Sequence, residues 1–138
     1  MVSGVPRSYA DGEIIFAEGA AADQMYVIRT GKVRIFRDQE GKQTTLATLK
    51  PGDFFGEMGM FEGKPRSAAS QAIGPTEINV IEPAEFRRMT GDPLVWDVLK
   101  KMSARIRDMD DALEKLSVQD TIRREHLASL SLRREPYL

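Results

Sequence analysis

The segment at residues 54–70, which reads FFGEMGMFEGKPRSAAS, holds the side chains best suited to binding a small polar ligand. Gly56 has no side chain, so a ligand can approach its backbone closely. The carboxylate of Glu57 can accept hydrogen bonds from a diol. Arg66 offers a planar fork of donors that suits a phosphate, and the small residues after it leave their backbone N–H groups open to an anion. An acid for a sugar and an arginine for a phosphate together favour a ribose-phosphate site.

The same residues also have a plainer interpretation. Gly59 and Gly63 keep the segment compact, and Pro65 stiffens the approach to Arg66. A tight surface loop of this kind can carry a Glu57–Arg66 salt bridge, which contributes little stability when it is exposed. The residue chemistry alone leaves both interpretations open.

Short strand-like runs separated by Gly and Pro precede residue 83 and must position this segment. Gly31 and Lys32 suggest a hairpin turn between two of the runs, and the Pro51–Asp53 triplet is a strong turn signal. Many short strands at close spacing favour a mainly β fold with C-terminal helices, an antiparallel β-roll (double-stranded β-helix or jelly roll) followed by a long helix. The expected strands are 13–17, 25–30, 33–37, 44–49, 67–72 and 77–81, the last two broken at Gly74-Pro75.

The pattern becomes helical after residue 83. A short helix is expected at 84–89, and a long one begins at Pro93, where Asp92 can cap it. Its apolar residues alternate steps of four and three, which is a heptad stripe. The stripe comprises Val95, Leu99, Met102, Ile106, Met109, Leu113 and Leu116, and it breaks at Asp120 and Arg123. The sequence therefore predicts one domain at 1–117 and a tail at 118–138, with a further short helix at 118–132 and loose residues at 133–138.

The order of the residues in 54–70 closely resembles the phosphate-binding cassette of the cyclic-nucleotide-binding domain family. That family includes catabolite-activator-type regulators, kinase regulatory subunits and nucleotide-gated channels. Its pattern of F-G-E, a short apolar helix and P-R-S/T/A-A stands here as 55–57, 58–61 and 65–68. The flanking motifs DGEIIF at 11–16 and LKPGD at 49–53 are also similar to the family. The resemblance covers roughly residues 9 to 117.

The resemblance implies a role for each residue of the cassette. Glu57 would accept from the ribose 2′-hydroxyl, and Gly56 would present backbone nearby. Arg66 would pair with the phosphate, while Ser67 and Ala68 would donate backbone N–H groups to it. Apolar residues would form the hinge side of the cassette or simply pack in the core. The full set of expected ligand-binding residues is Phe55, Gly56, Glu57, Met58, Arg66, Ser67, Ala68, Arg105, Met109 and Asp110.

The resemblance also bears on the base. Family members with Thr at the position of Ser67 tend to favour cGMP, whereas Ala or Ser favours cAMP, so we expect cAMP with cGMP as the alternative. On the long helix, Asp110 could accept from the adenine amino group, Arg105 or Arg107 could stack on the ring, and Met109 could lie beneath it. A solvent-facing helix surface is the alternative for these charges. Trp96 is expected to pack against the roll.

Composition excludes several other functions. The formal net charge of −1 argues against duplex DNA as a partner. No cysteine is available for a disulfide or a thiolate metal site, which fits the cytoplasm. No signal peptide or bilayer-spanning run is apparent. The single histidine, His126, lies in the tail without catalytic partners. The residues after 117 are too few for the winged helix-turn-helix of the transcription-factor branch.

Three hypotheses for function follow. The first is a regulatory sensor without catalytic activity, in which a bound cyclic nucleotide moves the long helix and an unidentified protein reads the change. The stripe at 95–116 then either forms a homodimer or lies on the roll. The second is a degenerate domain that binds no nucleotide and acts as a protein-interaction module. The third, a metal-dependent jelly-roll enzyme, needs several His ligands.

Overall fold

The computed structural model describes residues 4–131, with side chains described for residues 4–116. The fold is mainly antiparallel β with helices at the C-terminal side, as the sequence predicts. In chain order the elements are β1 (Val5–Tyr9), β2 (Ile14–Phe16), β3 (Met25–Gln39), β4 (Lys42–Leu49), β5 (Phe54–Phe55), α1 (Glu57–Glu62), β6 (Ala69–Ile81), α2 (Pro83–Thr90) and α3 (Pro93–Ser131).

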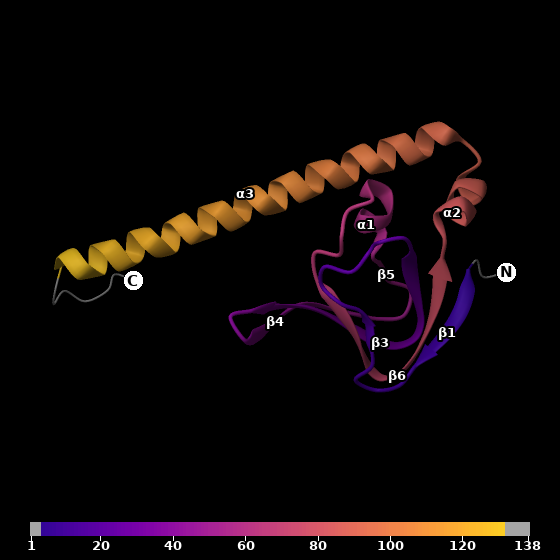
Figure 1. Cartoon of the computed structure of the whole chain (residues 1–138), viewed down its shortest axis with the longest axis horizontal. Coiled ribbons are helices and arrows are strands. Elements are labelled where there is room, and N and C mark those ends of the chain that lie inside the picture. The colour runs from indigo at the N-terminus through magenta and orange to yellow at the C-terminus, as the bar shows by residue number, and fades with distance from the viewer. Residues whose placement is uncertain (1–3, 132–138) are drawn as a thin grey trace. The chain divides into compact units, whose positions relative to one another are not determined.

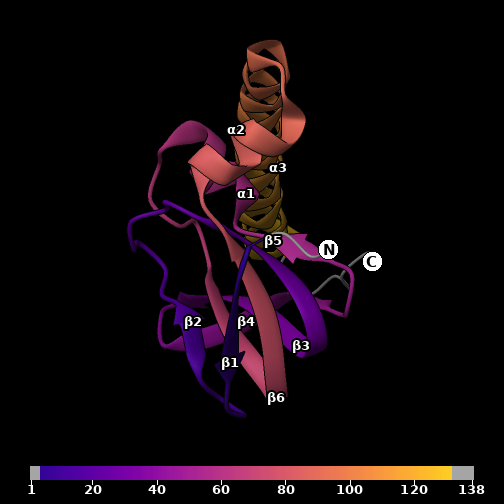
Figure 2. The same cartoon turned by 90° about the vertical axis from the view of Figure 1, so that its right-hand side faces the viewer.

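Two long strands, β3 and β6, form the centre of the sheet. The hydrogen-bonded order is β1-β6-β3-β4, with β2 on β6 and β5 on β3. All of these pairs are antiparallel. Strands β1, β6 and β3 run alongside one another in Figure 2, while α1 and α2 lie at the same end of the roll in Figure 1. This arrangement places the start of β6, and hence the segment that precedes it, next to β3.

The predicted hairpin at Gly31-Lys32 is wrong, because β3 runs through it as one strand. The pairing of β3 with β6 shifts register on both sides of Gly31. A Cβ at Gly31, whose φ is +84°, would lie 2.5 Å from the Pro75 carbonyl oxygen. Glycine here therefore permits a bulge and a close backbone approach, not a chain reversal. The predicted break at Gly74-Pro75 lies opposite this bulge on the partner strand. It does not end the strand, because β6 continues from Ala69 to Ile81.

Two further expectations differ from the structure. Strand β1 was not predicted, and it occupies a sheet edge, where a proline such as Pro6 is tolerated. The helix expected to end near 116 instead continues as α3 to Ser131, since nothing between Pro93 and that residue is Gly or Pro. The loose residues expected at 133–138 and the side chain of His126 lie outside what the structure describes.

Two apolar clusters hold the roll and its helices together. The first lies inside the roll and contains the buried residues Tyr26, Ile28, Val33, Phe55, Ile78 and Val80. The second joins α1 and α2 to the first turns of α3 through Met25, Met60, Phe61 and Ile81, with Phe86, Trp96 and Leu99 packed against them. Phe61 makes edge contacts with Phe86 and Trp96, at centroid distances of 5.3 and 5.1 Å. Trp96 thus packs on the roll, as predicted.

The chain divides into two compact units, one ending at Ser103 and one beginning at Ala104. The first contains the whole roll, α1, α2 and the first turns of α3. The second contains the remainder of α3, so the structure does not test the expected boundary at residue 117. Within the described residues, none of the helices combines the length and apolar character that a membrane span requires.

Candidate functional site

The site is built around α1, the short helix inside the cassette. Gly56 precedes the helix with φ 79°, and Gly63 ends it with φ 68°, both in the left-handed region that favours glycine. Met60 and Phe61 on α1 are buried in the second apolar cluster. A Cβ on Gly59 would lie 2.4 Å from the Cβ of Ala22, so the helix approaches the preceding loop closely. The predicted short apolar helix is therefore confirmed, and it packs closely against the preceding loop.

Arg66 is buried beside α1, with only 5% of its surface exposed. Its two terminal nitrogens donate to backbone carbonyls, at 2.6 Å to Gly56 and 2.7 Å to Gln24. The guanidinium carbon stacks 4.2 Å above the ring centroid of Phe16 and 5.5 Å from that of Tyr26. Its Nε is buried and has no hydrogen-bond partner. The side chain is thus held by its hydrogen bonds and its ring contacts. It still has unused N–H donors, because a guanidinium has five N–H groups.

The backbone after Arg66 leaves two N–H groups unused. The Arg66 carbonyl oxygen accepts from the Gly19 N–H at 2.8 Å. The Arg66 N–H donates to the Ala20 carbonyl oxygen, also at 2.8 Å. The Ser67 carbonyl accepts from Arg37 Nε at 3.0 Å. No described residue accepts from the N–H of Ser67 or of Ala68. These groups lie next to the buried arginine, which is the chemistry of an anion site.

Glu57 is half-buried in the first turn of α1. Burial raises the pKa of its carboxyl, while a hydrogen bond from its own backbone and the charge of Arg66 act in the opposite direction. Burial also lowers the pKa of Arg66, with Tyr26 and nearby carboxylates opposing the change. Among the described residues no ion pair joins Glu57 to Arg66. The plainer interpretation, an exposed salt bridge in a surface loop, is therefore wrong, because Arg66 turns inward onto backbone carbonyls.

The other expected residues fall into two groups. Phe55 and Ala68 are buried around the cassette, Met58 is half-buried, and Ser67 is exposed. Arg105, Met109 and Asp110 lie on α3 in the second unit and are all exposed. Their contact with a base stays a prediction. No described group of three or more His, Cys, Asp or Glu side chains is arranged to hold a metal ion.

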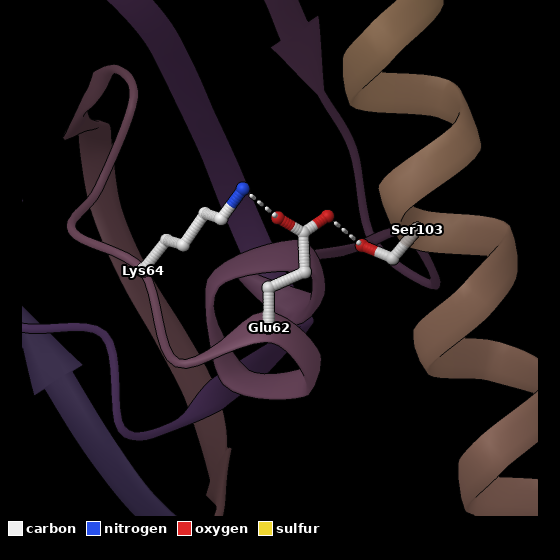
Figure 3. Close-up of polar contacts among 3 residues, drawn as sticks. All are labelled: Glu62, Lys64 and Ser103. Carbon is white, nitrogen blue, oxygen red and sulfur yellow. Dashed lines mark hydrogen bonds and ion pairs between the residues drawn. The ribbon is translucent and has the colours of Figure 1, made fainter.

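A polar contact that the sequence did not reveal joins the cassette to α3 (Figure 3). Glu62, the last residue of α1, has a side chain that is only 4% exposed and pairs with Lys64 at 3.7 Å. Its Oε1 accepts from Ser103 Oγ at 3.0 Å. Ser103 is itself buried. The only available signal was an acid at the end of the cassette helix, and nothing in its spacing pointed to Ser103.

Comparison with known proteins decides the family. The family model described as the cyclic nucleotide-binding domain matches residues 6–92, which include the complete cassette. The chain belongs to the cyclic nucleotide-binding domain family. The resemblance found in the sequence and the observed β-roll are thereby confirmed.

Curated relatives within the family are regulators. The chain is 36% identical over 135 residues to the cyclic AMP receptor protein of Thermus thermophilus, covering 94% of this chain and 61% of that protein. It is 32% identical to the cAMP-dependent protein kinase type II regulatory subunit of Drosophila melanogaster, covering 81% of this chain and 29% of that protein. The chain therefore spans less than two thirds of the length of these relatives.

Solved structures agree on the fold. The crystal structure of the Thermus thermophilus catabolite activator protein has a TM-score of 0.66 and 34% identity, with 82% of this chain and 55% of that chain covered. The cGMP-bound form of the EAL enzyme Bd1971 has a TM-score of 0.65 and 26% identity, with 86% of this chain and 32% of that chain covered. Domains of this family thus serve within proteins of differing activity.

Proposed function

We propose that this chain binds a cyclic nucleotide in the cassette and acts as a regulatory sensor without catalytic activity. The observation that carries the proposal is the buried Arg66 with a spare Nε donor, next to the unused N–H groups of Ser67 and Ala68. A cyclic phosphate is a monoanion, and hydrogen bonds to charged groups contribute about 1.5–3 kcal/mol each. Glu57, at the start of the same short helix, would accept from the ribose 2′-hydroxyl.

We propose cAMP as the favoured ligand and cGMP as the weaker one. Ser67 is exposed within the cassette, and it stands where family members that favour cGMP have Thr. The relatives from Thermus and Drosophila are both named for cyclic AMP. Arg105, Met109 and Asp110 would supply the contacts to the base from α3.

The signal would leave the cassette through the start of α3. The buried Glu62–Ser103 hydrogen bond links the end of α1 to α3, and Trp96 packs on Phe61 of α1. A ligand that draws α1 toward its phosphate would strain both contacts. Such a ligand shifts the position of α3 only by its differential affinity for the two states.

The apolar stripe of α3 would carry the output by forming a homodimer. Met102, Ile106 and Met109 are 51, 48 and 64% exposed, and Leu113 and Leu116 are equally open. A stripe with heptad spacing buries itself against a second helix. Met102→Glu combined with Ile106→Glu should make the protein monomeric in sedimentation-velocity runs. A dimer that survives both substitutions would show that the stripe does not form the interface.

Calorimetric titration of cAMP and cGMP tests the proposed ligand. The protein should first be unfolded and refolded to remove any nucleotide retained during purification. We expect micromolar or tighter binding of cAMP, a Kd of about 1 μM corresponding to roughly −8 kcal/mol, with cGMP binding more weakly. Arg66→Lys should weaken binding at least tenfold, because a single ammonium cannot replace the planar fork.

Arg34→Ala is the matched control for that variant. Arg34 is also an arginine stacked on an aromatic ring, 4.3 Å above Phe36, but its hydrogen bonds go to side chains of the sheet. The control should bind as the unmodified chain does. Absence of binding for both nucleotides would refute the proposal and favour the degenerate protein-interaction domain.

A further inference from the structure

Arg37, near the end of β3, makes a contact with the cassette that the proposed function does not use. Its Nε donates to the Ser67 carbonyl oxygen at 3.0 Å. The residue is half-buried, and the hydrogen bond itself is exposed to solvent. The strand pairing Phe36↔Ala69 brings this part of β3 beside the start of β6. Arg37 therefore reaches the cassette from a strand of the rigid sheet and not from a neighbouring loop.

The carbonyl that Arg37 holds belongs to the peptide group between Ser67 and Ala68. The chain contains no cis peptide among the described residues, so the carbonyl and the N–H of this group point in opposite directions. Fixing the carbonyl on Arg37 thus directs the Ala68 N–H away from the Arg37 guanidinium. Like the Ser67 N–H, that N–H has no acceptor among the described residues.

The preceding peptide group is fixed in a parallel way. The Arg66 carbonyl accepts from Gly19 N at 2.8 Å, which directs the Ser67 N–H away from the loop that contains Gly19. The two successive donors are therefore oriented by different means. A neutral backbone N–H sets the first, and a charged guanidinium sets the second.

We propose that Arg37 is a positioning residue for the anion site, which aims and polarises the Ala68 N–H without touching the ligand. A guanidinium on the carbonyl side makes a charge-assisted hydrogen bond, and hydrogen bonds in a chain polarise one another. The N–H on the far side of the same peptide then becomes a stronger donor to a phosphate. This inference rests on the proposed function, because it assigns the anion of a cyclic nucleotide to that donor.

The test combines calorimetry with the amide spectrum of the full chain. Arg37→Gln should weaken cAMP and cGMP binding equally, by roughly tenfold, since the phosphate is common to both. Arg37→Lys should recover part of the loss. In the ligand-free protein, the Ala68 amide proton should shift upfield in Arg37→Gln, because its peptide loses a charged partner. A residue that only stabilised the fold would leave that resonance in place.

Arg34→Ala is again the control, because it removes an arginine from the same strand without touching Ser67. It should leave both affinities and the Ala68 resonance unchanged. The positioning role alone would be overturned, and the proposed function left standing, by either of two results. One is that Arg37→Gln binds as the unmodified chain does, and the other is that its Ala68 resonance does not move. A loss confined to one of the two nucleotides would also overturn it, by showing that Arg37 reads the base. An unmodified chain that binds neither nucleotide would overturn the proposed function as well.

Discussion

Replacement of Arg66 by alanine should destabilise the ligand-free protein as well as weaken binding. The substitution leaves the Gly56 and Gln24 carbonyls without the donors they hold at 2.6 and 2.7 Å, and it removes the stack on Phe16. Both hydrogen bonds are only partly buried, so each lost partner costs about 1 kcal/mol, the low end of the usual range. Lost stacking and packing would add a similar amount, whereas release of the desolvated Nε offsets part of the cost.

The expected net loss is about 2 kcal/mol, which lowers the Tm of a unit of this size by roughly 8–16 °C. Thermal unfolding followed by circular dichroism, with nucleotide removed beforehand, measures it directly. Arg34→Ala provides the baseline, because its partners Gln43 and Thr45 are exposed and Gln71 is half-buried, so these side chains can turn to water. A Tm for Arg66→Ala within about 2 °C of that baseline would show that the arginine does not hold the two carbonyls, and the geometry of the site would need revision.

Four further predictions test the cassette and its contact with α3. Gly56→Ala should lower the free energy of unfolding by about 2 kcal/mol, because it forces an alanine into the left-handed region and places a Cβ 2.8 Å from an Arg66 nitrogen. Gly63→Ala is the control, since Gly63 is also left-handed but no atom lies within 4 Å of its added Cβ. It should cost about half as much. Since the pKa of Glu57 is raised on folding, the free protein should lose stability as pH rises from the ordinary carboxyl pKa through the folded value, and urea titrations of Glu57→Gln should lack that decline. The affinity for cAMP should rise over the same pH interval, because the ribose 2′-hydroxyl would donate to the ionised Glu57 carboxylate. A calorimetric affinity that does not change with pH would contradict this. Ser103→Ala should lower the free energy of unfolding by about 1–2 kcal/mol. It should also speed amide hydrogen exchange at the start of α3. Unchanged exchange would show that the hydrogen bond to Glu62 does not connect α3 to the cassette.

The cassette could be predicted from the sequence because its residues follow one another within a short stretch. Gly56, Glu57 and Arg66 carry their chemistry in their types, and their order matched a family pattern. The burial of Arg66 could not be predicted, because it depends on the Gly56 and Gln24 carbonyls and on the Phe16 ring, which tertiary packing brings together. The same holds for Arg37 and Glu62, whose partners lie far along the chain.

The errors in the fold also have local causes. Gly31 was interpreted as a turn because glycine favours both turns and bulges, and only the pairing with β6 distinguishes them. Strand β1 was missed because its residues are mostly exposed and show no apolar alternation. The first half of α3 was predicted from its stripe and from Pro93. Residues 118–132 were predicted as a separate short helix because the stripe breaks at Asp120 and Arg123, whereas the structure has one continuous helix to Ser131.

The pairing of the first strand with the last has a consequence for the order of folding. Val5 pairs with Val80, and β2 also pairs only with β6. During synthesis, both early strands must therefore wait without partners until Ala69–Ile81 has left the ribosome. Such sequence-distant pairing closes a long loop before it gains any contact, which slows folding. A chain interrupted before β6 would lose the central strand and both early strands together, so the roll should form late and in one step.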